Sequence, residues 1–241
     1  MIEIDGLTLR YGGVTPLDSV TIQFPMGTNG LIGPNGAGKT SFFNVMSGFA
    51  RPQEGTITAF GEDLLAMPHF RRARWGLRRT FQTEQAIQEL SIYENVALIH
   101  EHAKADTTGT SRREDILGAI EFVGIKSDPY AKVASLSAHE RRLVELARAV
   151  VGKPRVVLLD EPAAGLPDDE TVQMGEVIKR IPEHMDALVI LVDHDMTLVQ
   201  NTCTKVAVLD FGKLIADGPT AEVLRDEQVM RAYLGTAEVK A

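Results

Sequence analysis

Cysteine is almost absent from this chain of 241 residues, since Cys203 is the only one. No disulfide can form within the chain, so we expect a reducing compartment. Long hydrophobic runs are missing too, because the longest covers Ala187 to Val192, whereas a bilayer span needs roughly 20 apolar residues. The first residues include acids and lack the apolar stretch of a signal peptide. We therefore expect any role at a membrane to depend on a partner.

Positive charge is also in deficit, with 25 basic against 33 acidic residues and a formal net charge of −8. This balance argues against a protein that holds nucleic acid by its overall field. One local exception is a basic cluster around Trp75, formed by Arg71, Arg72, Arg74, Arg78 and Arg79. It is typical of a solvated helix face. The alternative is contact with anionic headgroups or with a membrane partner.

Strand and helix signals alternate along the chain and predict an α/β fold. Alternating apolar residues indicate short strands in the first 60 residues, and continuous apolar runs after residue 155 indicate buried parallel strands separated by helices. Residues 83–150 are expected to be a helical insertion, because S-x-x-E capping signatures begin at Ser91, Ser111 and Ser137. Within it, residues 104–112 are polar and predict a surface loop.

A phosphate-binding pattern lies between an apolar strand and a helix. Residues 33–40, GPNGAGKT, match G-x-x-x-x-G-K-[ST]. Its glycines let successive N–H groups face phosphate oxygens, and the helix adds its positive N-terminal end. Lys39 is predicted to reach the β- and γ-phosphates of ATP, and Thr40 to hold Mg²⁺. The residues expected to bind the nucleotide here are Asn35, Gly36, Ala37, Gly38, Lys39, Thr40 and Ser41.

A second candidate is the apolar run VVLLDEP, which begins at Val156 and ends in two carboxylates. Ligands of open α/β sheets bind at the carboxyl ends of strands. Asp160 suits the water shell of Mg²⁺, and Glu161 suits a general base that deprotonates an attacking water. A charged strand end without a role is the alternative, and the nearby P-loop favours the functional interpretation.

The P-loop, the LLDEP strand and His194 in VDHD together resemble the ATPase subunits of ABC transporters over nearly the whole chain. The resemblance implies one ABC ATPase domain over residues 1–241. A RecA-like P-loop NTPase core with an antiparallel β edge would occupy residues 1–82 and 151–241, and a helical signature subdomain residues 83–150.

The same resemblance assigns roles to further residues. Tyr11 would stack on adenine, Gln82 would sense Mg²⁺, and His194 would contact the γ-phosphate. The catalytic set implied is Lys39, Gln82, Glu161 and His194, and the Mg²⁺ set is Thr40, Gln82 and Asp160.

The stretches RTFQ, DEPAAGL and RAYLG are similar to ATPase subunits of bacterial branched-chain amino acid uptake systems. They imply an ATP- and Mg²⁺-dependent importer subunit at the cytoplasmic face of the membrane. Its partners would be a second ATPase subunit, identical or different and arranged head to tail, and permease subunits, with a substrate-binding protein acting indirectly and no nucleic acid. Alternatives are a lipopolysaccharide-type export ATPase and a weakly hydrolysing regulatory subunit.

The chain departs from the family signature LSGGQ, which touches the γ-phosphate bound by the partner subunit. The corresponding residues after Leu136 are Ser137, Ala138, His139 and Glu140. A side chain at His139 hinders close approach of the backbone to phosphate, and Glu140 brings negative charge toward it. We expect a poor ATP site on this face and a heterodimer with unequal sites. The alternative is that Ser137 and Glu140 only cap a helix.

Smaller expectations concern four other positions. Asp168 follows Pro167, which stands where the family usually has Asp or Asn. Asp168 is predicted to cap the next helix, and the alternative is that it substitutes for the family's residue one position late. Ile92 and Tyr93 are candidate contacts of a permease, with core packing as the alternative. Cys203 is expected to be a buried structural thiol.

Overall fold

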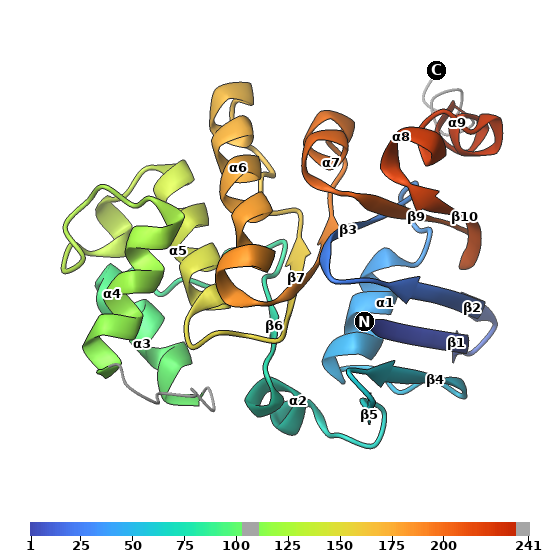
Figure 1. Cartoon of the computed structure of the whole chain (residues 1–241), viewed down its shortest axis with the longest axis horizontal. Coiled ribbons are helices and arrows are strands. Elements are labelled where there is room, and N and C mark those ends of the chain that lie inside the picture. Colours follow the sequence, from blue (N-terminus) through green and yellow to red (C-terminus); the bar gives the residue numbers. More distant parts are fainter. Residues whose placement is uncertain (103–110, 235–241) are drawn as a thin grey trace.

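An antiparallel sheet of four strands forms one side of the molecule in the computed structural model, which describes residues 1–102 and 111–234. Most of the loop expected at residues 104–112 falls outside the described residues. The strand order is β2-β1-β4-β5, with bounds Ile2–Tyr11 (β1), Val14–Phe24 (β2), Glu54–Ala59 (β4) and Glu62–Asp63 (β5) (Figure 1). The antiparallel strands expected as an edge of the parallel sheet therefore form a sheet of their own.

The second sheet has six strands in the order β10-β9-β3-β8-β7-β6. Its strands are Gly27–Ile32 (β3), Leu77–Arg79 (β6), Val156–Asp160 (β7), Leu188–Val192 (β8), Lys205–Asp210 (β9) and Lys213–Pro219 (β10). All neighbouring pairs are parallel except β10 with β9. The carboxyl ends of β3, β7 and β8 consequently meet at one edge, where each continues into a predicted functional segment.

Helices cover the parallel sheet on both sides (Figure 1). Their bounds are Lys39–Ser47 (α1), His69–Trp75 (α2), Ile92–His102 (α3), Arg112–Val123 (α4), Ala138–Val150 (α5), Asp168–Met185 (α6), Met196–Thr202 (α7), Thr220–Val223 (α8) and Glu227–Leu234 (α9), with a 3-10 turn at Val133–Ser135. Helices α3, α4 and α5 pack on one another, and we call them the three-helix group.

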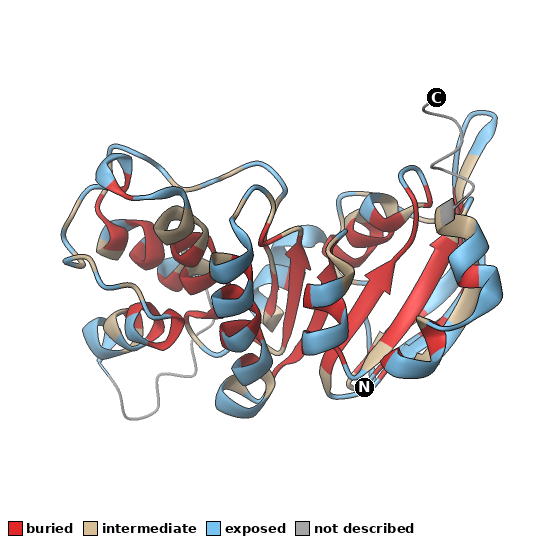
Figure 2. Ribbon diagram, turned by 90° about the horizontal axis from the view of Figure 1, so that it is seen from above, coloured by how far each residue is buried: buried red, intermediate tan, exposed pale blue. Residues whose placement is uncertain are grey.

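Two hydrophobic cores lie on opposite faces of the parallel sheet, because successive strand residues point to opposite sides. In β7, Val157 and Leu159 pack with the three-helix group, α6 and α7, while Val156 and Leu158 pack with α1 and the antiparallel sheet. All four side chains are fully buried, as is expected for a parallel strand covered on both faces. Figure 2 shows these buried strands between helices whose outer faces are exposed.

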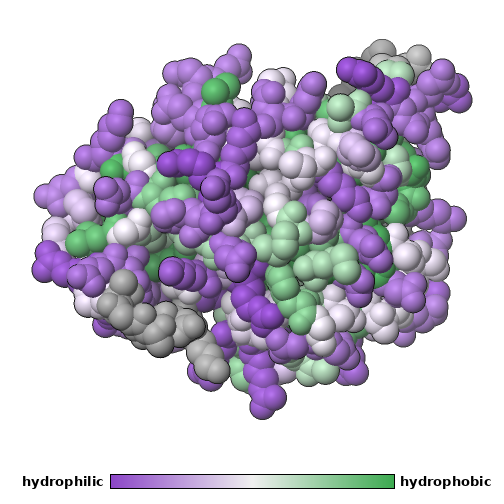
Figure 3. Space-filling model, in the orientation of Figure 1, coloured by the Kyte–Doolittle hydropathy of each residue, from purple (hydrophilic) through white to green (hydrophobic). Residues whose placement is uncertain are grey.

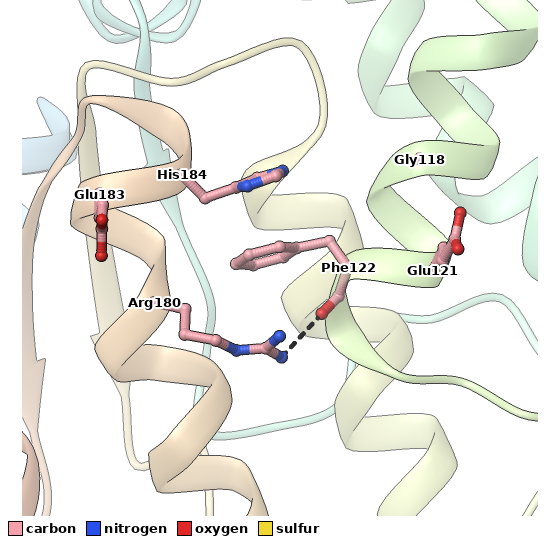
Figure 4. A pocket seen from close by; sticks show the side chains of 6 residues that line it. All are labelled: Gly118, Glu121, Phe122, Arg180, Glu183 and His184. Carbon is pink, nitrogen blue, oxygen red and sulfur yellow. Dashed lines mark hydrogen bonds between the residues drawn. The ribbon is translucent and has the colours of Figure 1, made fainter.

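A stacked seam joins the three-helix group to α6 beside an open cleft of about 650 Å³ (Figure 4). The rings of Phe122 in α4 and His184 in α6 stack with their centroids 4.6 Å apart. The Arg180 guanidinium donates to the Phe122 carbonyl at 3.1 Å and lies 5.2 Å from the centre of its ring. Stacking and cation–π contact thus hold α4 against the sheet-covering helix α6.

The capping predictions are confirmed at two sites and partly at the third. Reciprocal hydrogen bonds join Ser91 to Glu94 and Ser111 to Glu114. Ser137 caps α5 by accepting from the Glu140 N–H at 3.1 Å. The Glu140 carboxylate, however, accepts from the Ser127 hydroxyl at 2.6 Å instead of bonding back to Ser137.

The cap predicted at Asp168 is wrong. Pro167 occupies the N-cap position in an extended conformation, without a side-chain cap, and Asp168 is the first helical residue. Its carboxylate lies with Asp169 and Glu170 in the first turn, where negative charge is favoured by the helix dipole.

The interpretation of the basic cluster as a solvated helix face is wrong for three of its five arginines. Arg72 and Arg78 are buried and donate to backbone carbonyls, and the Arg79 side chain is buried against Asp160. Burial also lowers the pKa of Arg72 and of Arg78. Only Arg71 and Arg74 are exposed, which leaves too few of these charges at the surface for the membrane-facing alternative.

We expect Arg72→Met to destabilise the fold, because the guanidinium donates to Val45, Met46 and Met67. Without it, carbonyls at the end of α1 lose a charged donor, and the free energy of unfolding should fall by about 3 kcal/mol. The matched control Arg74→Met should stay within about 0.5 kcal/mol of the parent, as surface changes do. Urea unfolding measures both, and equal effects would contradict the assignment.

Candidate functional site

The P-loop conformation depends on glycine at two positions. Gly33 has φ 150° and Gly38 has φ 109°. A Cβ atom would lie 2.1 Å from the Leu209 carbonyl oxygen at Gly33, and 2.2 Å from that of Pro16 at Gly38. Both contacts are with backbone and cannot be relieved by a side-chain rotation. The P-loop is thus packed tightly against the end of β9 and the start of β2.

Lys39 is the cation of this loop and is buried. Its ammonium group donates to the carbonyls of Gly33 at 2.6 Å and Pro34 at 2.9 Å. Burial lowers the pKa of Lys39, while the charges of Glu161 and Asp160 oppose that shift. A buried ammonium held mainly by carbonyls is well placed to pair with an arriving phosphate.

Three predicted catalytic side chains meet at Glu161. Its Oε2 accepts from the Gln82 amide at 3.0 Å, and its Oε1 lies 2.8 Å from Nε2 of His194. The Glu161 N–H donates to the Val192 carbonyl at the end of β8 at 2.8 Å. Glu161 has φ 49°, an unfavourable value for a residue with a side chain that is often found at functional sites.

These groups face a pocket of about 450 Å³ at the carboxyl edge of the parallel sheet. It is lined by Pro16, Asn35, Gly36, Ala37, Gly38, Lys39, Thr40, Ser41, Gln82, Glu161, Val192 and His194. The structure therefore brings together the P-loop residues and the three predicted partners from later segments. Tyr11 does not belong to this lining: it lies at the end of β1, opposite Val14, with 55% of its surface exposed.

Asp160 has a partner that sequence reasoning missed. Its Oδ2 forms a buried ion pair with Arg79 at 2.9 Å, and its N–H donates to the Thr80 hydroxyl at 3.0 Å. The guanidinium also lies 4.9 Å from the ring centre of Phe81. The signal was available, because a parallel strand ending in RTFQ beside LLDEP would place Arg79 and Asp160 at the same edge.

The residues expected to hold Mg²⁺ fit that ion in chemistry. Thr40 and Gln82 line the pocket, and Asp160 directly precedes Glu161. Their hydroxyl, amide and carboxylate oxygens are the hard donors that Mg²⁺ prefers, with several water molecules retained. Held by these residues, Mg²⁺ would supply positive charge that offsets the charge of the nucleotide phosphates.

Two expectations about other residues are corrected or confirmed. Ile92 is fully buried and contributes to the core, so it cannot contact a permease. Tyr93 is partly buried and stacks on Tyr130 with the ring centroids 5.5 Å apart. Cys203 is a buried free thiol as predicted, and burial raises its pKa to about 12.

The fold and the site define a P-loop ATPase. A profile described as "ABC transporter" matches residues 17–164, and one described as "Branched-chain amino acid ATP-binding cassette transporter" matches residues 213–239. The chain belongs to the ABC transporter family and is one of its ATPases.

Curated relatives agree with this assignment. The high-affinity branched-chain amino acid transport ATP-binding protein LivG of Escherichia coli (strain K12) is 32% identical over 252 residues, which cover 98% of each chain. The lipopolysaccharide export system ATP-binding protein LptB of Haemophilus influenzae is 36% identical over 208 residues, which cover 86% of this chain and 85% of LptB.

Solved structures show the same fold. An ATP-binding cassette of an ABC transporter in its ADP conformation has a TM-score of 0.86 and 24% identity, with 98% of both chains covered. A dimeric bacterial ABC transporter cassette has a TM-score of 0.79 and 21% identity, covering 91% of this chain and 99% of its own.

We expect Asp193→Asn to raise stability more at pH 8 than at pH 4. Asp193 is buried beside His194; its Oδ1 accepts from the Asp195 N–H at 3.0 Å, and its Oδ2 has no hydrogen-bond partner among the described residues. Burial raises its pKa, against the opposing effect of backbone hydrogen bonds. Protonated Asp193 therefore contributes to the free energy of unfolding. This contribution is complete below the unfolded-state pKa and is lost as the pH rises through the folded-state pKa, because the buried carboxylate then becomes charged.

Thermal unfolding of both proteins across this pH range measures the effect. The wild type should lose more Tm than Asp193→Asn between pH 4 and pH 8. Asp169→Asn, on the exposed first turn of α6, serves as the control for a general charge effect. A pH-independent difference between Asp193→Asn and the wild type would contradict the prediction.

Proposed function

We propose that this chain is the ATP-hydrolysing subunit of a membrane importer for branched-chain or other amino acids. The observation that carries hydrolysis is the meeting of Gln82, Glu161 and His194 beside the P-loop pocket. The amino acid substrate class rests on the match of residues 213–239 and on the relatives named for branched-chain amino acid transport.

In this proposal Glu161 orients a water molecule in line with the γ-phosphorus and accepts its proton. Lys39 pairs with the β- and γ-phosphates, and His194 hydrogen-bonds the γ-phosphate from the neighbouring strand end. Positioning and charge stabilisation account for most of the rate in phosphoryl transfer. Tyr11, which is exposed at the hairpin end, would stack on adenine.

Two alternatives are less well supported. An export role of the lipopolysaccharide type has the LptB relative in its favour, but that match spans 86% of this chain, against 98% for LivG. A regulatory subunit that hydrolyses little would not need both Glu161 and His194, yet both meet at the pocket.

A permease is the proposed membrane partner, and the chain would work at the cytoplasmic face of the membrane. None of the helices within residues 1–102 and 111–234 is long and apolar enough to cross a membrane. Apolar side chains gather in separate patches on the mostly hydrophilic face of Figure 3. An apolar groove of about 220 Å³ beside α2 includes the exposed rings of Phe49 and Phe70. We propose that a permease segment binds in this groove. We also propose that residues 83–150 form the helical signature subdomain.

Glu161→Gln tests the proposed function. We expect at least a hundredfold loss of ATP turnover and of leucine uptake, because a general base contributes that much or more. The chain should be purified through an affinity tag with its permease and ATPase partners and reconstituted in vesicles. Asp169→Asn, on the first turn of α6, is the matched control. Uptake of leucine that continues at the wild-type rate would contradict the proposal.

The signature segment supports a second step of the proposal, which is a pair of unequal ATP sites. His139 is half-buried at the first turn of α5, and its Nε2 is buried without a hydrogen-bond partner in the described part of the chain. The Glu140 carboxylate accepts from the Ser127 hydroxyl and would still bring negative charge toward a phosphate held by the partner. The hindrance at His139 remains, because its side chain stands where close backbone approach to phosphate favours glycine.

We expect the two sites of a head-to-tail pair to contribute unequally. Glu161→Gln in this chain should remove most turnover, because its P-loop would be completed by the partner's signature. The matching change in the partner should cost less than twofold, since His139 would complete that site poorly. ATP turnover of the two singly substituted complexes measures the difference. Equal losses would show that the sites are equivalent.

A further inference from the structure

Arg142 in α5 links two segments that flank the catalytic site. Its Nη1 donates to the Gln82 carbonyl at 3.4 Å, and its Nη2 donates to the Ala164 carbonyl at 3.2 Å. Gln82 follows β6, and Ala164 lies in the turn after β7, so one guanidinium spans the exits of two neighbouring parallel strands. The rigid planar fork of arginine fixes the separation of the two carbonyls that it binds.

Both carbonyls belong to residues that also bind Glu161. The Gln82 amide donates to the Glu161 carboxylate at 3.0 Å, and the Ala164 N–H donates to the Glu161 carbonyl at 3.1 Å. Arg142 is therefore connected to the Glu161 carboxylate through Gln82, and to the Glu161 backbone carbonyl through Ala164. It does not line the pocket that contains the P-loop.

Glu161 needs such restraint because its backbone is in the left-handed region, with φ 49°. This conformation is unfavourable for a residue with a side chain, and it persists only where the surroundings hold it. The Val192 carbonyl holds the Glu161 N–H from one side. The Ala164 N–H holds the Glu161 carbonyl from the other side, and the turn that contains Ala164 is anchored to α5 by Arg142.

We propose that Arg142 is a positioning residue that sets the orientation of Glu161 for attack on ATP. The proposal rests on the catalytic role of Glu161 advanced above. Loss of the guanidinium should let Gln82 and the Ala164 turn move apart, so that Glu161 occupies its catalytic orientation less often. The P-loop and its glycines are unaffected, so ATP binding should change little.

The test compares four single variants of the full chain, each purified with its transporter partners through an affinity tag. Arg142→Met should lower kcat for ATP about tenfold while KM stays within twofold, and Arg142→Lys should recover part of the loss by donating to one carbonyl. Arg180→Met is the matched control, because its guanidinium also donates to a backbone carbonyl of the three-helix group but lines a different cleft from the one that contains Glu161. Glu161→Gln sets the floor of turnover.

Each outcome decides the proposal. A kcat for Arg142→Met within twofold of the wild type, with Glu161→Gln inactive, would overturn the role of Arg142 alone. An equal loss in Arg180→Met, or a raised KM with unchanged kcat, would show general loosening and would also overturn it. If Glu161→Gln keeps wild-type turnover, the catalytic assignment fails and the inference fails with it. Nucleotide binding and thermal unfolding of Arg142→Met identify a misfolded variant, for which Arg142→Lys then provides the comparison of kcat.

Discussion

The hydrogen-bonded carboxylate of Glu161 is the interaction on which the arrangement of the site depends. It joins Gln82 after β6 to His194 after β8, while its own backbone continues β7. These strands are neighbours in the sheet, so their carboxyl ends lie side by side. The parallel register alone brings together residues more than 100 positions apart in the chain. A strand running in the opposite direction would place its carboxyl end at the far edge of the sheet.

Most of the charged side chains at the carboxyl edge of the parallel sheet have a partner. Arg79 neutralises Asp160 in a buried pair, and the Lys39 ammonium is held by carbonyls close to Glu161. Asp193, which directly precedes His194 in the chain, is buried, and burial raises its pKa. Burying such groups is costly unless they are paired, and the Arg79–Asp160 ion pair and the carbonyls around Lys39 supply such partners. This fits the general pattern in which perturbed titratable groups mark functional sites.

Much of the site was predictable from sequence because its chemistry is encoded in short contiguous motifs. At Gly33 and Gly38 of the P-loop pattern, a Cβ would collide with backbone atoms. The glycines of the motif therefore indicate, from sequence alone, where the loop packs closely. The burial of Arg72 was not predictable, because its partners lie in a segment distant in sequence. Arg72 is buried by carbonyls of α1 about 26 residues earlier. The Asp168 cap failed for a local reason, since the extended Pro167 had already taken the N-cap position.

The three-helix group is attached to its surroundings by contacts of two different kinds. At the seam with α6, aromatic stacking and an arginine over a ring bury apolar surface. At the nucleotide edge, Arg142 makes two hydrogen bonds to carbonyls on segments that adjoin Glu161. Stacked apolar contacts resist exposure to water, whereas hydrogen bonds can be exchanged for bonds to water at small net cost. At the polar end, the α5 side chain of Arg142 bonds to Gln82, which itself binds Glu161, so α5 is connected to the catalytic carboxylate through exchangeable hydrogen bonds.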